Sequence, residues 1–270
     1  IKFPSFKNTF SALAYSAGGS YRFKENVIGK INVVSGFRAP NMAELGSNGV
    51  HEGTFRYEIG NNNLKEEQNI QVDISSHFHA KHISMDVAAF YNSIGNYIFI
   101  SPTGSTMNGF FVYQYLQQNA SLSGGEFTMD VHPRPLDRLH FEINFSVVTG
   151  KLSNGKYLPM IPPNKMNNSI RIDMKDNKYF HETYFNIGIT SVYAQRNISD
   201  EETTTPAYSL VNIGAGSKVK IGKQRAGLCL TVNNLFDKKY YDHLSRLKPY
   251  GIYNIGRNIV FSINIPIGIK

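Results

Sequence analysis

Apolar and polar side chains alternate along this 270-residue sequence in repeated segments of roughly ten residues. In the clearest segment, from Leu139 to Val147, every second residue is apolar and the residues between them are polar. Because successive residues of a β-strand point to opposite faces of a sheet, such a segment has one apolar and one polar face. The pattern returns at 69–78, 82–92 and 258–265. It predicts an all-β chain whose strands have two unlike faces.

The connections between these segments alternate between short and long. We expect eleven strands, at residues 8–18, 26–36, 67–79, 82–98, 112–132, 137–149, 165–175, 179–195, 206–221, 224–235 and 255–268. The short connections lie at 24–25, 81, 133–136, 176–177 and 222–223, and the long ones at 37–66, 99–111, 150–164, 196–205 and 236–254. Short turns on one side and long loops on the other are typical of an up-and-down antiparallel transmembrane β-barrel. A Greek-key sandwich does not require such an alternation.

Composition excludes several other classes of protein. The longest apolar runs are shorter than the 18 residues that a transmembrane helix needs, whereas barrel strands need no such run. Cys229 is the only cysteine, which excludes a disulfide within the chain and a zinc site built from cysteines. The net charge of +8 is spread over turns and loops without the stacking aromatic residues of a nucleic-acid reader. We therefore expect no nucleic-acid partner.

The odd strand number suggests that the barrel is incomplete. Bacterial single-chain barrels have even numbers of strands, and lipid cannot satisfy an open sheet edge. The sequence also begins at Ile1, without an initiator methionine or a signal peptide. We therefore expect residues 1–270 to be the C-terminal portion of a β-barrel domain whose remaining strands lie elsewhere.

Short motifs spread over residues 30–265 carry a family resemblance. The first two are Gly-Phe-Arg-Ala-Pro-Asn at 36–41, followed by Glu-Leu at 44–45, and Gly-Asn-Asn-Asn-Leu-Lys-Glu-Glu at 60–67. Further motifs lie at 89–91 with 96–98, 118–120 with 124–126, 160–163, 232–240 and 256–258. Any one of them is a weak signal. As an ordered set they resemble the barrels of TonB-dependent outer-membrane receptors.

The resemblance implies an architecture, a location and partners. It implies a 22-stranded barrel in the bacterial outer membrane, of which eleven strands are the C-terminal half, closed by an N-terminal plug domain that is not part of these 270 residues. It also implies active import of a scarce nutrient complex. The implied partners are the inner-membrane TonB complex, acting through the missing N-terminal part, the receptor's own plug and the outer-membrane lipid.

The motifs also have local structural interpretations. Pro40 cannot donate to a sheet ladder and favours an extended Ala39, so it ends a strand and begins a long loop. The segment 60–63 offers glycine and asparagine where we expect positive φ angles. The segment 234–237 has turn residues at a strand end, and the acidic run 200–202 is expected to be a solvated loop.

Candidate substrate-binding residues lie in the loops of the predicted outer side. His51 and Glu52 offer nitrogen and oxygen ligands in a glycine-flanked loop, and Arg56, followed by Tyr57, could pair with a carboxylate or an anionic chelate. His243 is the other histidine on that side. His51 is a candidate metal ligand, but a single histidine without a spaced partner makes no complete site, and the alternative is a solvated loop residue.

The leading functional hypothesis is a TonB-dependent active transporter and receptor that imports an iron chelate, haem or a related metal complex. Alternatives are an oligosaccharide or peptide importer of the same family, with a surface lipoprotein as partner, and a passive porin or adhesin. An enzyme is not expected, because no nucleophile with a nearby base is evident. No resident cofactor is expected either, since a metal complex would be the transported cargo.

Overall fold

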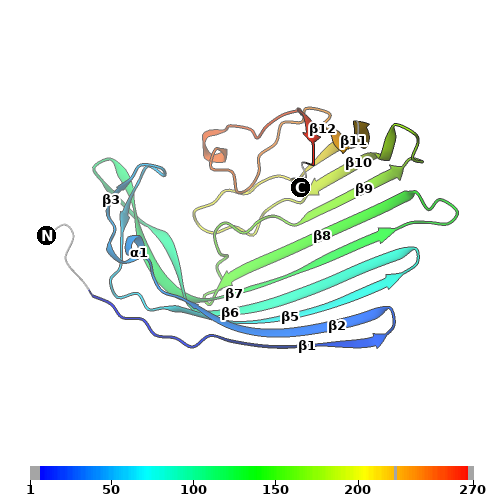
Figure 1. Cartoon of the computed structure of the whole chain (residues 1–270). Coiled ribbons are helices and arrows are strands. Elements are labelled where there is room, and N and C mark those ends of the chain that lie inside the picture. Colours follow the sequence, from blue (N-terminus) through cyan, green and yellow to red (C-terminus); the bar gives the residue numbers. More distant parts are fainter. Residues whose placement is uncertain (1–6, 222–223, 267–270) are drawn as a thin grey trace.

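The structure is a computed structural model that describes residues 7–221 and 224–266. Eleven strands follow one another in one curved sheet, each antiparallel to its neighbours in sequence (Figure 1). They are β1 (Tyr15–Lys24), β2 (Val27–Arg38), β5 (Glu67–Ala80), β6 (Ile83–Met107), β7 (Phe110–Val131), β8 (Leu139–Leu152), β9 (Lys165–Asp173), β10 (Phe180–Val192), β11 (Tyr208–Ile221), β12 (Gln224–Asn233) and β13 (Asn258–Asn264). The path confirms the predicted up-and-down all-β fold. The sheet is open, with β1 at one edge and β13 at the other.

Short elements fill two of the long connections. Between β2 and β5 the chain forms the helix α1 (Met42–Gly46) and the hairpin of β3 (Asn48–His51) and β4 (Arg56–Ile59). β4 also pairs in parallel with β7, where Tyr57 lies opposite Val112. A single 3-10 turn, η1 (Lys248–Tyr250), lies between β12 and β13. Among the described residues, no helix is both long and apolar enough to cross a membrane.

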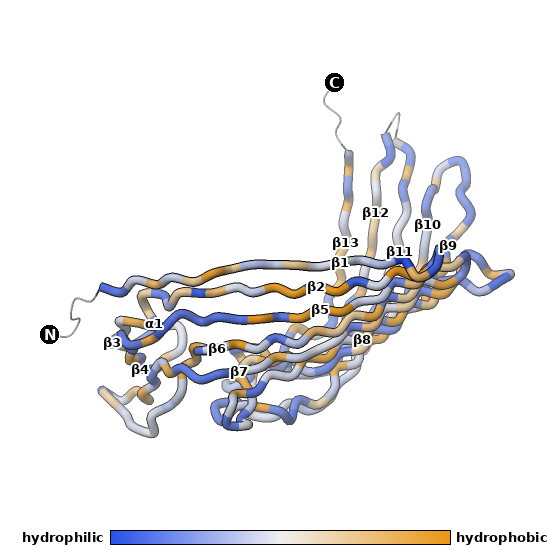
Figure 2. The backbone as a smooth tube through the Cα atoms, turned by 90° about the horizontal axis from the view of Figure 1, so that it is seen from below, coloured by the Kyte–Doolittle hydropathy of each residue, from blue (hydrophilic) through white to orange (hydrophobic). Residues whose placement is uncertain are grey.

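The two faces of the sheet differ as the alternation predicts. In β10, Phe185, Ile187 and Ile189 lie on one face and are 53%, 48% and 44% exposed, and we assign this apolar face to the convex side of the sheet. Figure 2 shows apolar residues spaced along the neighbouring strands of the same wall. In the described part of the chain, no second protein layer covers these residues, and lipid is the environment that suits them. By the same alternation, the polar residues between them belong to the concave face.

Many of the buried apolar residues gather in two clusters, where the long connections pack against β6, β7 and β8. One cluster joins Leu45, Leu64 and Ile98. A second cluster consists of Ala120, Leu152, Leu158 and Ile161. Because both clusters contain residues of the long connections, the apolar packing stabilises the loops and not a central core.

The largest departures from the predicted strands occur in two places. The first strand spans 15–24 and not 8–18, because Tyr15 pairs with Ser35 and the pairing continues to the turn before Val27. The expected loop 99–111 is instead an extension of β6 and β7 into a long hairpin. Asn108 and Gly109 form its turn, with φ angles of 53° and 83°. Two successive positive φ angles match the twist of the flanking strands.

Candidate functional site at the outer rim

The long connections all lie at one end of the sheet, because consecutive strands are antiparallel. We call this end the outer rim and define it by residues 39–66, 99–111, 153–164, 193–207 and 234–257. It lies to the left in Figure 1, where α1 and β3 are labelled. The opposite end carries the short turns. In outer-membrane barrels the longer loops face the outside of the cell.

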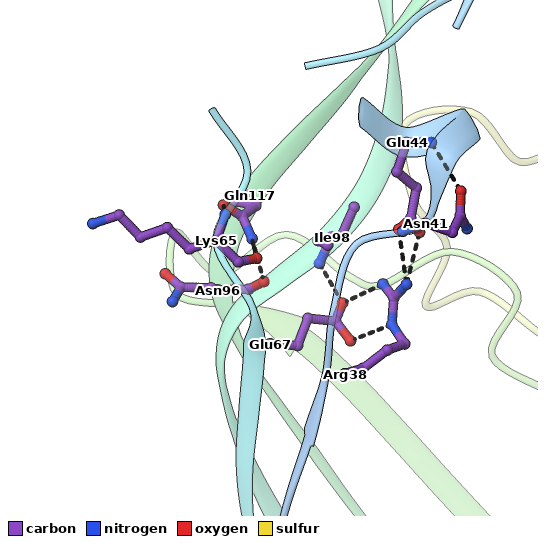
Figure 3. Close-up of polar contacts among 8 residues, drawn as sticks. All are labelled: Arg38, Asn41, Glu44, Lys65, Glu67, Asn96, Ile98 and Gln117. Carbon is purple, nitrogen blue, oxygen red and sulfur yellow. Dashed lines mark hydrogen bonds and ion pairs between the residues drawn. The ribbon is translucent and has the colours of Figure 1, made fainter. Parts of the chain in front are cut away.

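Arg38, the last residue of β2, organises the start of the rim (Figure 3). Its Nε and Nη2 donate to the two carboxylate oxygens of Glu67 at 2.8 and 2.9 Å. Its Nη1 donates to both oxygens of Glu44 at 2.9 and 2.8 Å. Both carboxylates are largely buried, with side chains 11% and 14% exposed for Glu44 and Glu67. One guanidinium thus neutralises two desolvated carboxylates from separate motifs.

The same carboxylates fix the neighbouring backbone. Asn41 caps α1, because its Oδ1 accepts from the Glu44 amide at 2.9 Å while Glu44 Oε2 accepts from the Asn41 amide at 2.8 Å. Glu67 Oε1 also accepts from the Ile98 amide at 2.6 Å. The network therefore ties the loop after β2 to β5 and β6. These motif residues therefore have a structural role, because their polar groups bond to other residues of the rim.

Gly60 has a different role from the one expected. Among the described residues with positive φ angles, none lies in 60–63. A Cβ on Gly60 would lie 2.6 Å from the backbone nitrogens of Gly46 and Ser47, so only glycine allows this approach to the end of α1. The positive φ angles predicted for 60–63 are wrong. The turn predicted at 234–237 is confirmed, with φ of 50° at Asn234 and 52° at Asp237.

The β3–β4 hairpin carries four of the candidate binding residues. His51 and Glu52 lie at its tip and are exposed, and His51 contacts Thr54 Oγ1 at 3.2 Å through Nδ1. Tyr57 is buried, and its hydroxyl donates to Asn48 Oδ1 at 2.7 Å. The hairpin thus offers His51 and Glu52 to the solvent, whereas Tyr57 holds the two strands together.

Arg56 pairs with His51 next to the tip of the same hairpin, and it lies beside a buried carboxylate. Its Nε donates to Glu58 Oε1 at 2.8 Å, and Glu58 is only 4% exposed. The Tyr115 hydroxyl donates to the other oxygen, Glu58 Oε2, at 3.0 Å. The Arg56 guanidinium also lies 4.9 Å from the ring centre of Tyr113. These contacts orient Arg56 and leave a quarter of its side chain exposed.

His243 lies at the contact between two other long connections, 193–207 and 234–257. Its Nδ1 is 2.8 Å from Thr205 Oγ1 and 3.5 Å from Lys248 Nζ, and its side chain is 1% exposed. Glu202 Oε1 lies 3.5 Å from Nε2. Burial lowers the pKa of His243 below its ordinary value, although the Glu202 carboxylate opposes this shift. His243 therefore joins two loops from a buried position that disfavours its charged form, and the structure does not bring it to His51.

The acidic run 200–202 was predicted to be solvated, and for Glu202 that prediction is wrong. Glu202 accepts from the amides of Met160 and Ser199, at 2.9 and 3.1 Å. Desolvation raises the pKa of Glu201 to about 7, and the positive charge of Arg56 partly opposes the rise, although part of the Glu201 side chain stays exposed. Glu202 thus belongs to the packed part of the rim, whereas Asp200 and Glu201 are exposed, as predicted.

A pocket of about 180 Å³ opens beside this run. Its walls come from β6, β7 and two long connections, and they include Leu116, Gln118, Lys156, Tyr157, Asp200 and Glu201. Lys156 and Asp200 form an ion pair at its edge. Sequence reasoning missed Lys156 and Tyr157, since nothing local distinguishes them from other loop residues.

Comparisons with known proteins agree with this geometry. A family model described as "TonB dependent receptor-like, beta-barrel" matches residues 2–235. The chain is similar in structure to the copper transporter OprC, with 15% identity and a TM-score of 0.77. It is also similar to the siderophore receptor PirA from Acinetobacter baumannii, with 18% identity and a TM-score of 0.66. A third similar structure is the FrpB iron transporter from Neisseria meningitidis, with 14% identity and a TM-score of 0.67.

Each of these similarities covers 93% of the present chain but only part of the other protein. The matched share is 38% of OprC, 40% of PirA and 39% of FrpB. The chain therefore spans less than half of the length of the solved structures it matches. At these sequence identities, the similarity shows the fold.

Proposed function

Because the chain belongs to the TonB-dependent receptor β-barrel family, whose members are bacterial outer-membrane proteins, we propose that it is part of an active transporter of that membrane. In this proposal, residues 1–270 form the C-terminal half of a 22-stranded barrel, and an N-terminal part supplies the other strands and the plug. The open edges at β1 and β13 support it, because a sheet in lipid must close.

The proposed transporter takes its energy from the inner-membrane TonB complex, which acts on the N-terminal part, and its convex face contacts lipid. The family match over residues 2–235 is the observation that carries this proposal. The second candidate is an importer of an oligosaccharide or peptide, with a surface lipoprotein as its partner.

The proposed substrate is an iron chelate, haem or a related metal complex. The similarity to structures described as copper, siderophore and iron transport proteins favours this class. The test is uptake of labelled ferric chelates, haem and copper by a deletion strain, by the same strain carrying the intact gene, and by a strain without TonB. We expect uptake of one complex to need both the gene and TonB. Equal uptake of every complex in all three strains would remove the substrate class.

We propose that Arg56 contacts the anionic part of the cargo, with His51 and Glu52 at the entrance. Arg56 is held in place by Glu58 and still exposes part of its side chain. Tyr57 and His243 would then act by holding the loops. Arg56→Gln is expected to weaken binding of an anionic chelate by about tenfold or more, the scale of a charged hydrogen bond. Glu52→Gln, which also removes one charge but from the exposed tip, is the variant for comparison. Chelate titration of the purified receptor measures both.

A further inference from the structure

A second cluster of potential ligands lies at the end of the sheet opposite the outer rim. Asp130 lies near the end of β7, His132 directly follows that strand, and His140 lies near the start of β8. Phe141 points to the convex face and is 37% exposed, so its neighbour His140 points to the concave, lumen-facing side. One ligand atom from each of Asp130, His132 and His140 lies within 4.8 Å of the other two.

The Asp130 carboxylate lies close to both imidazoles. His132 Nε2 is 3.1 Å from Asp130 Oδ2, and His140 Nδ1 is 3.7 Å from Asp130 Oδ1. The centres of the two imidazole rings are 4.6 Å apart. Among the described residues, Oδ1 of Asp130 is buried without a hydrogen-bond partner. A buried carboxylate oxygen without a partner is costly, and a bound cation would satisfy it.

His140 also has the outer contact that metal-binding histidines usually have. Its second nitrogen, Nε2, lies 3.1 Å from Asp173 Oδ2. The other Asp173 oxygen accepts a hydrogen bond from Arg171 Nε at 2.8 Å. A carboxylate on the far nitrogen fixes the tautomer and the orientation of a ligating imidazole. Nδ1 of His140 is thereby directed toward Asp130 as an electron-pair donor.

We propose that Asp130, His132 and His140 form a binding site for a divalent transition-metal ion on the lumen wall near the short-turn end of the barrel. Two imidazole nitrogens and one carboxylate oxygen are ligands that Zn²⁺ accepts, with a fourth position for water or another group. Tetrahedral zinc with bonds of about 2.0 to 2.1 Å sets its ligands about 3.4 Å apart, so small side-chain rotations close the site.

The site is tested with Zn²⁺ on the complete receptor, purified in detergent without a histidine tag and treated with a chelator. Competition with a metal indicator measures the affinity, and Co²⁺ absorption reports coordination geometry. We expect one Zn²⁺ per receptor at this site. His132→Gln and His140→Asn are each expected to weaken binding by more than about 100-fold, and Asp173→Asn by about 10- to 100-fold, the range for outer-shell partners.

His77→Asn is the matched control, because His77 also faces the lumen and contacts one carboxylate, Asp86, at 2.6 Å. We expect this variant to bind Zn²⁺ like the unmodified receptor. Unchanged binding in His132→Gln and His140→Asn, an equal loss in His77→Asn, or no binding by the unmodified receptor would overturn the site. Heat-dependent gel mobility confirms that each variant is folded. The measurement does not involve uptake, so it is separate from the test of transport.

Discussion

At the scale of single residues, Arg38 is the side chain on which the rim most depends. Arg38→Ala leaves Glu44 and Glu67 as nearly buried carboxylates without a cation. Breaking a buried ion pair costs about 3–5 kcal/mol, and since 43% of the Arg38 side chain is exposed we expect a smaller loss. Hydrogen exchange should show loss of protection in residues 39–66 while the middle of β5 stays protected.

Arg38→Lys tests whether charge alone is enough. A lysine ammonium cannot form the paired hydrogen bonds that Arg38 makes with Glu67 and Glu44 at once, so we expect protection between those of the alanine variant and the native protein. If the lysine variant matched the native protein, simple charge neutralisation would replace the paired geometry as the explanation.

Gly60 gives a second prediction at this scale. Gly60→Ala places a methyl group against the backbone of Gly46 and Ser47, which cannot move aside as a flexible side chain can. Overpacking of this kind costs about 1–3 kcal/mol, so the loop 39–66 should be cleaved faster by protease. Gly49→Ala is the control in the same loop, because a Cβ there meets nothing within 4 Å. Equal cleavage of the two variants would contradict the role of Gly60.

His243 makes the contact between two loops sensitive to pH. Burial and Lys248 lower its pKa in the folded loops, while Glu202 and Asp242 act in the opposite direction. An opened loop therefore binds a proton more readily than the closed one below pH 6.5, and the closed state loses stability as the pH falls through that region. The hydrogen-exchange protection of residues 203–205, measured relative to the intrinsic exchange rate at each pH, should fall on the acid side of pH 6.5. In His243→Gln this pH dependence should be absent; if it persists, another group carries it.

At the scale of elements, the sequence predicts the repeated strands but does not predict irregular features that occur only once. The alternation in 139–147 identifies β8, because each residue repeats the same two environments. The β6–β7 extension was missed although Asn108-Gly109 is the strongest local signal for a hairpin turn. The alternation that would indicate continued strands is broken near Pro102, because the register shifts between Pro102 and Thr106.

The site is less predictable than the strands, because its contacts join distant parts of the sequence. The motifs indicate that Arg38 and Glu67 matter, but only the register that pairs these two residues shows that they meet. Asp130 and His140 converge in the same way, across two strands. His132 has no local signal, and a lone histidine after a strand predicts no metal site.

The strand β10 allows a direct test of the membrane-facing side. Ile187 lies near the middle of β10 on the convex face and Asn186 lies beside it on the concave face. Ile187→Lys should destabilise the barrel by about 2–4 kcal/mol, the cost of lysine in lipid near the bilayer middle. Asn186→Lys, which faces the lumen, should cost much less. Denaturant unfolding in lipid vesicles measures both, and equal losses would contradict the assignment of the faces.

At the scale of the whole molecule, the two edges explain the odd strand number. Every residue of β1 and of β13 is exposed, and in the part of the chain that the structure describes β1 pairs only with β2 and β13 only with β12. An edge strand has unpaired amides and carbonyls along one side. Within lipid such groups need partners, so the proposed closed barrel must pair both edges with other strands.

This requirement gives a prediction for the complete receptor. If other strands close the barrel, the amides of β1 and β13 should exchange about as slowly as those of the interior strand β7. In the 270-residue chain alone, in detergent, both edge strands should exchange much faster than β7, since half of their backbone groups lack partners. Hydrogen exchange with mass spectrometry compares the two samples strand by strand. Rapid exchange of β1 and β13 in the complete receptor would mean that these edges stay open, and the half-barrel proposal would then be wrong.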